Sequence, residues 1–435
     1  MADIRPFRGV HYNKEAVDDI SGVICPPYDI ITPRMDEELH RRSPYNFIRI
    51  EYNRIQPGDS DTNNRYTRSA AIFRQWLEEK VMVADEAPAI YVHDQFFNLG
   101  GAAYRRRSLI VRVRLEAWEK NIIRPHENTF KGPKKDRINL LRALNANTSP
   151  VMAMYEDKDL RISSLLNGQD KGDLLISTAE LDGERHNVWT ITEPQAVKEL
   201  IEYFKGKPLY VADGHHRYES ALVYQRERSQ CDSGSDLDAP YNFVMMTLLD
   251  MDDPGLIIFP THRLLHGLEP SALHTLEDRL KEYFDIQELP LSHPDMWHRV
   301  DALMVDGVGL KLLIAGLSEG KMSILTLRDF ASISSRMPSS HSDVYKKMDV
   351  SIVDHIILEE ILGMQSDDER RIAYTHNRQE AVDRVLSGDC QLAVITGMVK
   401  SQTIKDIADV GDRMPRKSTY FYPKLPSGLI VNHLV

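Results

Sequence analysis

The sequence has few cysteines and no excess of basic residues. Three of its 435 residues are cysteine, and their wide spacing excludes both a disulfide framework and a Cys-rich zinc motif. Lysine and arginine number 54 against 65 acidic residues, which gives a formal net charge of −11. Broad binding to DNA or to anionic membrane surfaces requires basic surface. We therefore expect DNA not to be a partner, although one local basic pocket is compatible with this charge.

Long apolar runs are also missing. No uninterrupted apolar segment approaches the roughly 20 residues of a membrane-spanning helix, and residues 1–6 carry no apolar signal core. We therefore expect a cytoplasmic protein that acts on a small molecule and has no membrane partner. With 42% apolar residues over 435 positions, the chain can bury large cores and is expected to divide into domains.

Several common catalytic and nucleotide-binding motifs do not occur in the sequence. It contains no His-Glu-x-x-His, no Cys-x-x-Cys and no Gly-x-x-x-x-Gly-Lys loop. Gly100-Gly101 indicates a hairpin turn and not a dinucleotide fingerprint. These absences exclude the most frequent nucleotide-binding folds and leave less common anion sites open.

The order of apolar segments predicts an α+β protein. Helical periodicity and short apolar runs alternate, and the character of the chain changes after about residue 266. We expect a mixed N-terminal domain over 1–265, an α+β domain over 266–400, and a segment over 401–435 that returns to the first domain. The predicted elements nearest the motifs are strands at 89–97, 107–115 and 208–212, and helices at 136–145, 193–204 and 216–228.

The most informative segment is 207–222. An apolar run stops at Asp213-Gly214 and a helical pattern begins directly after it, so the segment predicts a strand, a tight turn and a helix start. The N-terminus of a helix binds phosphate through free backbone N–H groups and the helix dipole. A capped helix with Asp213 as its N-cap is the plain alternative, but capping does not call for the residues His215, His216 and Arg217 that follow.

Each residue of this turn suits phosphate chemistry. Gly214 permits close approach of an anion, and Arg217 offers a planar fork of donors. His215 and His216 can donate to phosphate or carry a proton. Asp213 can hold Mg²⁺ or accept the proton of a hydroxyl nucleophile. We assign Gly214 to Arg217 to phosphate or nucleotide binding, and Asp213, His215 and His216 to catalysis.

Further segments supply possible partners for the turn. A charged run before the predicted 136–145 helix can provide a general base and phosphate ligands, although an exposed charged loop is the plain alternative. A Pro-stiffened loop and a cluster of small polar residues can line a substrate pocket, and a Lys-Ser-Thr run near the end of the chain can bind phosphate or simply pack through its aromatic neighbours. The residues assigned are Glu127 as base and metal ligand, Lys131, Arg137, Lys417, Ser418, Thr419 and Lys424 as phosphate ligands, and Tyr28, Asp29, Asn147 and Ser149 as substrate ligands.

These segments together resemble one bacterial and archaeal family, the domain of unknown function 1015, some of whose members carry a SpoOJ/ParB-like label. The resemblance spans nearly the whole chain. Residues 211–221 also resemble the strand–turn–helix element of the ParB-like fold and of free serine kinases built on it, which implies that the turn binds nucleotide phosphates. Glu127-Asn128 is similar to the start of a ParB box that helps to hold Mg²⁺. The segments that carry the family resemblance are 26–29, 126–129, 136–137, 146–150, 212–221 and 414–424.

The residues and the resemblance favour one function over several alternatives. We predict a Mg²⁺-dependent phosphotransferase on a small hydroxyl compound, with free serine as the first acceptor and a nucleotide or pyrophosphate as donor. With water as acceptor, the same site would act as a phosphatase. The alternatives are a ParB-like nucleotide-binding switch without turnover and a scaffold with an incidental polar turn. A homo-oligomer is compatible with all of them.

Overall fold

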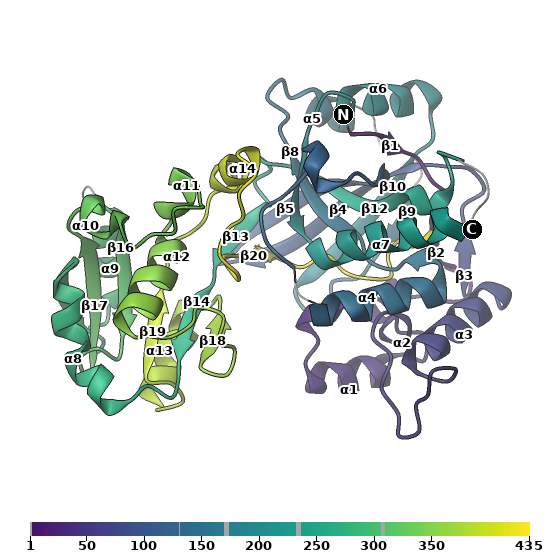
Figure 1. Cartoon of the computed structure of the whole chain (residues 1–435). Coiled ribbons are helices and arrows are strands. Elements are labelled where there is room, and N and C mark those ends of the chain that lie inside the picture. The colour runs from purple at the N-terminus through teal and green to yellow at the C-terminus, as the bar shows by residue number, and fades with distance from the viewer. Residues whose placement is uncertain (1, 130, 169–173, 232–235, 306–308) are drawn as a thin grey trace. The chain divides into compact units, whose positions relative to one another are not determined.

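The computed structural model describes the chain except for residues 1, 130, 169–173, 232–235 and 306–308 (Figure 1). It divides into two compact units, which are described separately: unit 1 is 1–257 with 423–435, and unit 2 is 258–422. Both mix helices with sheets, so the predicted α+β class is confirmed. The domain boundaries at 265 and 400 stay a prediction. No helix within the described ranges has the length and hydropathy needed to span a membrane.

Unit 1 is built on one large sheet. Over the described residues its strand order is β6-β11-β8-β12-β5-β4-β10-β9, and β1 pairs with β5. Most neighbours are antiparallel, but β6 with β11 and β8 with β12 are parallel. The strands are β1 (Ile4–Arg5), β4 (Ile90–Leu99), β5 (Ala102–Arg114), β6 (Ile123–Pro125), β8 (Val151–Tyr155), β9 (Leu174–Ser177), β10 (Glu184–Ile191), β11 (Leu209–Asp213) and β12 (Phe243–Asp250).

The two faces of this sheet bury separate cores, because successive side chains of a strand point to opposite faces. In β5, Leu109 and Val111 enter one core while Ile110 enters the other. Helices α4 and α7 pack against each other (Figure 1), and α4 contributes to both cores. The helices of unit 1 are α1 (Pro33–Arg42), α2 (Ile48–Glu51), α3 (Arg65–Glu78), α4 (Lys131–Leu144), α5 (Arg161–Gly168), α6 (Pro194–Phe204) and α7 (His215–Cys231).

Residues 423–435, at the end of the chain, pair with several segments of unit 1, and we call them the C-terminal strap. Ser427 exchanges backbone hydrogen bonds with Cys25 at 3.2 and 2.8 Å. Val431 pairs in the same way with Val10 of β2 (Val10–Tyr12), which itself pairs with β3 (Met82–Ala84). Strand β21 (Asn432–His433) pairs with β7 (Ala146–Asn147). The strap therefore joins three segments that are far apart in sequence.

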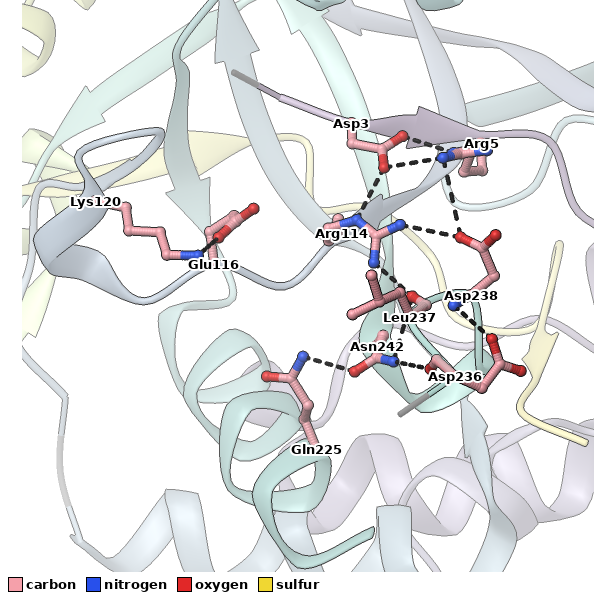
Figure 2. Close-up of polar contacts among 10 residues, drawn as sticks. All are labelled: Asp3, Arg5, Arg114, Glu116, Lys120, Gln225, Asp236, Leu237, Asp238 and Asn242. Atoms are coloured by element: carbon pink, nitrogen blue, oxygen red, sulfur yellow. Dashed lines mark hydrogen bonds and ion pairs between the residues drawn. The ribbon is translucent and has the colours of Figure 1, made fainter. Parts of the chain in front are cut away.

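An ion-pair network fastens β1 to the sheet and to the loop before β12 (Figure 2). Arg114 Nε lies 2.9 Å from Asp3 Oδ2, and Arg114 Nη2 lies 3.1 Å from Asp238 Oδ1. Arg5 Nε lies 2.6 Å from Asp3 Oδ1. We call Asp3, Arg5, Arg114 and Asp238 the edge network. It connects surface segments of unit 1 and contains none of the predicted site residues.

Unit 2 is a smaller α+β body. Its described residues form a sheet of order β15-β17-β16-β19-β14-β18, with apolar helices packed on it (Figure 1). A π-helix over Val353–Ile361 continues α12. The other elements are β13 (Ile257–Pro260), β14 (His262–Leu265), α8 (Pro270–Lys281), β15 (Phe284–Pro290), α9 (Met296–Val305), β16 (Lys311–Ala315), β17 (Lys321–Leu327), α10 (Phe330–Ser334), α11 (Asp343–Lys346), α12 (Asp349–Ile352), β18 (Ile372–Thr375), α13 (Arg378–Leu386), β19 (Leu392–Ile395), α14 (Ser401–Asp409) and β20 (Thr419–Tyr422).

Candidate functional site

The predicted strand, turn and helix around Asp213 are confirmed as β11, Gly214 and α7. Gly214 has a φ of +88°, and an added Cβ would lie 2.8 Å from Arg217 Nε. Both facts favour glycine at this position. The Gly214 N–H donates to Asp213 Oδ1 at 2.7 Å. The turn brings the first helical residues back over the strand end, so that Arg217 Nη2 lies 3.8 Å from Asp213 Oδ1.

A second cation reaches Asp213 from the C-terminal strap. Lys424 Nζ lies 2.8 Å from Asp213 Oδ2, and the side chain of Lys424 is 11% exposed. Burial opposes ionisation of Asp213, but the charges of Lys424 and Arg217, followed by His215, outweigh it and hold its pKa well below the ordinary value. Asp213 therefore holds two cationic side chains together at the N-terminus of α7.

Two buried histidines join the 126–129 segment to this turn. Because β6 runs parallel to β11, both strands end at the same edge of the sheet. His126 Nδ1 donates to the Val211 carbonyl at 2.7 Å, and the His126 backbone N–H donates to His215 Nε2 at 3.4 Å. Their rings meet edge to face, 4.8 Å apart. Glu127 follows His126 directly and is partly exposed at this edge.

Arg137 of α4 lies in a second, more deeply buried group. Its Nη1 lies 3.0 Å from Glu51 Oε1, and its Nε donates to Asp136 Oδ2 at 2.8 Å. The Tyr28 ring covers the guanidinium, with its centroid 3.9 Å from Arg137 Cζ. Burial raises the pKa of Tyr28, the charges of Arg137 and Arg217 lower it, and those of Asp29 and Asp213 raise it further.

Glu51 is a functional candidate that sequence reasoning missed. Its side chain is fully buried, and Ser149 Oγ donates to its Oε1 at 3.2 Å. Its Oε2 has no hydrogen-bond partner among the described residues, which is costly for a buried carboxylate. Glu51 ends α2 within an apolar helical pattern, and no local signal marks it apart from a charge at a core position.

A cavity of about 40 Å³ lies between α4, α7 and the 146–149 segment. Arg137 and Arg217 both line it, and Arg217 Nη1 also donates to the Pro150 carbonyl. The buried Arg217 Nε has no hydrogen-bond partner within the described ranges. Two guanidinium groups on one small cavity are typical of a site for a small anionic group. The other lining residues are Leu140, Leu141, Ala146, Asn147, Thr148, Ser149, Ser220 and Val244.

We call Asp213, Arg217, Lys424, Glu51 and Arg137 the strand-end cluster.

The predicted site residues outside this cluster differ in their surroundings. The side-chain oxygen of Asn147 accepts from the Met245 N–H and from Asn432 Nδ2, both at 3.0 Å, and its role in substrate binding stays a prediction. His216 is the second residue of α7 and is partly exposed, Asp29 is exposed, and the Lys131 side chain lies outside the described residues.

Three predicted phosphate ligands belong to unit 2. Ser418 is buried and its Oγ donates to the Pro415 carbonyl at 2.5 Å. The carbonyl of Lys417 accepts from Arg263 Nη1 at 3.1 Å. Lys417 itself has a positive φ of 52°, and Thr419 begins β20. These contacts close a local turn, and a phosphate role for the three residues stays a prediction.

The donor set around Asp213 fits an anion better than a resident cation. A Mg²⁺ ion on this carboxylate would lie next to the charges of Lys424 and Arg217, which repel it. Among the described residues there is no group of three or more His, Cys, Asp or Glu side chains that could hold a metal ion. The Mg²⁺ site at Asp213 and Glu127 stays a prediction.

Comparisons with known proteins establish the family. No curated protein matches the chain. Similar solved structures include a conserved hypothetical protein from Pyrococcus furiosus (10% identity, 75% of this chain and 95% of that chain, TM-score 0.35) and a free serine kinase in complex with ADP (10%, 74% and 92%, TM-score 0.36). SbnI from Staphylococcus aureus with a C-terminal truncation is also similar (10%, 74% and 87%, TM-score 0.36). These scores carry no argument about function. The model of the family described as a protein of unknown function, DUF1015, matches residues 4–351, and the chain therefore belongs to this family.

Proposed function

We propose that unit 1 is a phosphotransferase that moves a phosphoryl group from a nucleotide or pyrophosphate to a small hydroxyl compound, with free serine as the first acceptor to test. One observation carries the proposal. Asp213 holds the ammonium of Lys424 and the guanidinium of Arg217 together at the N-terminus of a long helix. Phosphoryl transfer requires mainly positioning and neutralisation of charge, and this arrangement supplies both.

The donor phosphates bind above the Asp213 turn in this proposal. The first backbone N–H groups of α7 have no partner within the helix and bind the phosphates, and the missing side chain of Gly214 makes room for the Arg217 guanidinium. Arg217 uses its unpaired Nε, and Lys424 shares its ammonium between Asp213 and a phosphate oxygen. His215 and His216 lie in the same first turn and donate to the phosphate. Mg²⁺ would be held by the donor's phosphates and not by Asp213, and it would neutralise part of their charge.

The acceptor occupies the cavity between α4 and α7. Ser149 and Arg217 line the cavity, while Tyr28 and Asp29 belong to the neighbouring loop. The acceptor oxygen forms a bond to phosphorus, the bond from phosphorus to the leaving oxygen breaks, and the hydroxyl proton passes to the carboxylate of Glu127. With water as acceptor, the same step is hydrolysis and the protein acts as a phosphatase.

The test is a transfer assay on the purified chain. ATP, ADP and pyrophosphate are offered with Mg²⁺ to L-serine and other small alcohols, and ³¹P NMR follows the products. We expect turnover by the wild type and at least a tenfold loss for Arg217→Ala, because a charge-assisted hydrogen bond contributes about 1.5–3 kcal/mol. Arg142→Ala is the matched control, since Arg142 lies on α4 and pairs with Glu227 of α7 at the surface.

The assay also separates the alternatives. Equal turnover by wild type and Arg217→Ala would contradict the assignment of the site. Nucleotide binding without any phosphorylated acceptor or released phosphate would replace the enzyme by the ParB-like switch, which stays a prediction here. If no donor is consumed and none raises the melting temperature, the proposed function is wrong.

A further inference from the structure

Two fully buried polar side chains lie beneath the C-terminal strap. Gln95 of β4 and Arg106 of β5 pair directly across the two strands, and they are 0% and 1% exposed. Arg106 Nη2 donates to Gln95 Oε1 and, at 2.7 Å, to the Pro423 carbonyl. Gln95 Nε2 donates to the Lys424 carbonyl at 3.1 Å. Two consecutive backbone carbonyls of the strap are thus held by one buried pair.

Burying this polar pair in the core costs more free energy than burying apolar side chains of the same size. Burial lowers the pKa of Arg106 to about 10, against the charges of Glu184, Asp253 and Asp213, and apolar side chains would fill the same space without desolvating a charge. What apolar side chains cannot do is fix the backbone of Pro423 and Lys424. The Nζ of that same Lys424 lies 2.8 Å from Asp213 Oδ2.

We propose that Arg106 and Gln95 are positioning residues, which act through the backbone of residues 423 and 424 to aim the Lys424 ammonium at Asp213. The inference rests on the proposed function in one respect, the contact of Lys424 with a phosphate. The site thereby depends on two sheet positions that lie 317 and 329 residues away from the carbonyls they hold.

Other anchors keep the strap in place when this pair is changed. The backbone bonds between Ser427 and Cys25 and the pairing of β21 with β7 do not involve Arg106 or Gln95. Loss of the pair therefore releases the backbone next to Lys424 without detaching the strap. We therefore expect only a local effect, the loss of the ion pair between Lys424 and Asp213.

The first experiment measures the position of Lys424 without any ligand. Arg106→Met and Gln95→Met are treated with acetic anhydride, and mass spectrometry gives the extent of acetylation at Lys424. We expect several-fold faster acetylation than in the wild type. Gln95→Met removes no charge, so it separates release of the backbone from a direct effect of the Arg106 charge on Asp213. Unchanged acetylation in both variants would overturn the proposal.

The matched control is Arg107→Met. Arg107 follows Arg106 in β5, points to the opposite face of the sheet and pairs with Asp94 of β4 at 2.7 Å. Its loss disturbs the same two strands without touching the strap. We expect it to lower the melting temperature while leaving acetylation of Lys424 at the wild-type rate, and faster acetylation in this variant would overturn the assignment of a specific role.

The second experiment is a double-mutant cycle read by calorimetric binding of pyrophosphate. Arg106→Met should weaken pyrophosphate binding about tenfold, which is the effect of losing one charge-assisted contact. In a Lys424→Met background the same change should weaken binding less than twofold, because the side chain that Arg106 positions is absent. Additive losses would overturn the proposal. If the wild type binds neither pyrophosphate nor ATP or ADP, the proposed function fails, while acetylation of Lys424 still decides the positioning role.

Discussion

The strand-end cluster and the edge network are both groups of ion pairs in unit 1, but they differ in burial and in completeness. Glu51 and Arg137 of the cluster are 0% and 5% exposed, whereas Asp238 and Arg5 of the network are 72% and 41% exposed. In the cluster, Glu51 Oε2 and Arg217 Nε lack partners among the described residues. The network instead shares Asp3 between Arg5 and Arg114 (Figure 2).

The differences in burial and in hydrogen bonding distinguish a candidate functional site from ion pairs that only stabilise the fold. Exposed ion pairs are screened by water and stabilise a fold only slightly. Buried charges cost several kcal/mol to desolvate, and a buried polar atom without a partner needs an explanation, of which a functional role is one. The strand-end cluster therefore stands out as the candidate site on physical grounds that the edge network does not share.

The largest effect is expected from Glu51→Gln. The change leaves Arg137 buried with a weaker partner, and breaking one side of a buried ion pair costs about 3–5 kcal/mol. Chemical denaturation measures the free energy of unfolding. The double variant Glu51→Leu with Arg137→Leu is the control, because removing both charges recovers part of the loss. A cost below about 1 kcal/mol for Glu51→Gln would remove the contrast between the two regions.

A smaller loss of stability is expected from Gly214→Ala. A residue with a side chain at positive φ costs about 1–2 kcal/mol, and the new Cβ would also push against Arg217. Gly100→Ala is the matched control, because Gly100 has a positive φ and open space around it. Equilibrium unfolding and pyrophosphate binding should both fall for Gly214→Ala, and unfolding alone for Gly100→Ala. Loss of binding in both variants would contradict a role for the turn.

Sequence reasoning reached the parts of this site that are local. An apolar run ending at Asp213-Gly214 and a helical pattern after it were enough to predict β11, the turn and α7, because strand, turn and helix propensities act over a few residues. The pairing of Lys424 with Asp213 joins residues 211 positions apart, and it follows from how the strap crosses the sheet. No spacing in the sequence encodes that path.

Sequence reasoning missed Glu51 because its partners are distant in the sequence. Glu51 lies in a pattern that predicts a core helix, and its role depends on Arg137 and Ser149, which arrive from other elements. Lys417 and Lys424 are seven positions apart in one predicted phosphate-binding run, but they belong to different compact units, and the phosphate role of Lys417 stays a prediction.

The pH dependence of stability tests the charge arrangement at Asp213. Its pKa is lower in the folded than in the unfolded protein, so its contribution to stability is present above the unfolded value near 3.8 and is lost as the pH falls below it. The difference in melting temperature between wild type and Asp213→Asn should therefore be constant above pH 5 and shrink below pH 3.8. Lys424→Met is the control, because it removes a cation that lowers this pKa. A difference independent of pH would contradict the arrangement.

The smallest effect is expected from Asp238→Ala in the edge network. Asp238 is 72% exposed, and its partner Arg114 keeps Asp3 at 2.9 Å, so the free energy of unfolding should fall by no more than about 0.2–1 kcal/mol. The loss should diminish further at 1 M salt, which screens exposed charges. Glu51→Gln measured in the same salt is the comparison, because a buried pair is screened far less. If Asp238→Ala cost as much as Glu51→Gln, or if salt weakened both equally, burial would not be the quantity that distinguishes the two regions.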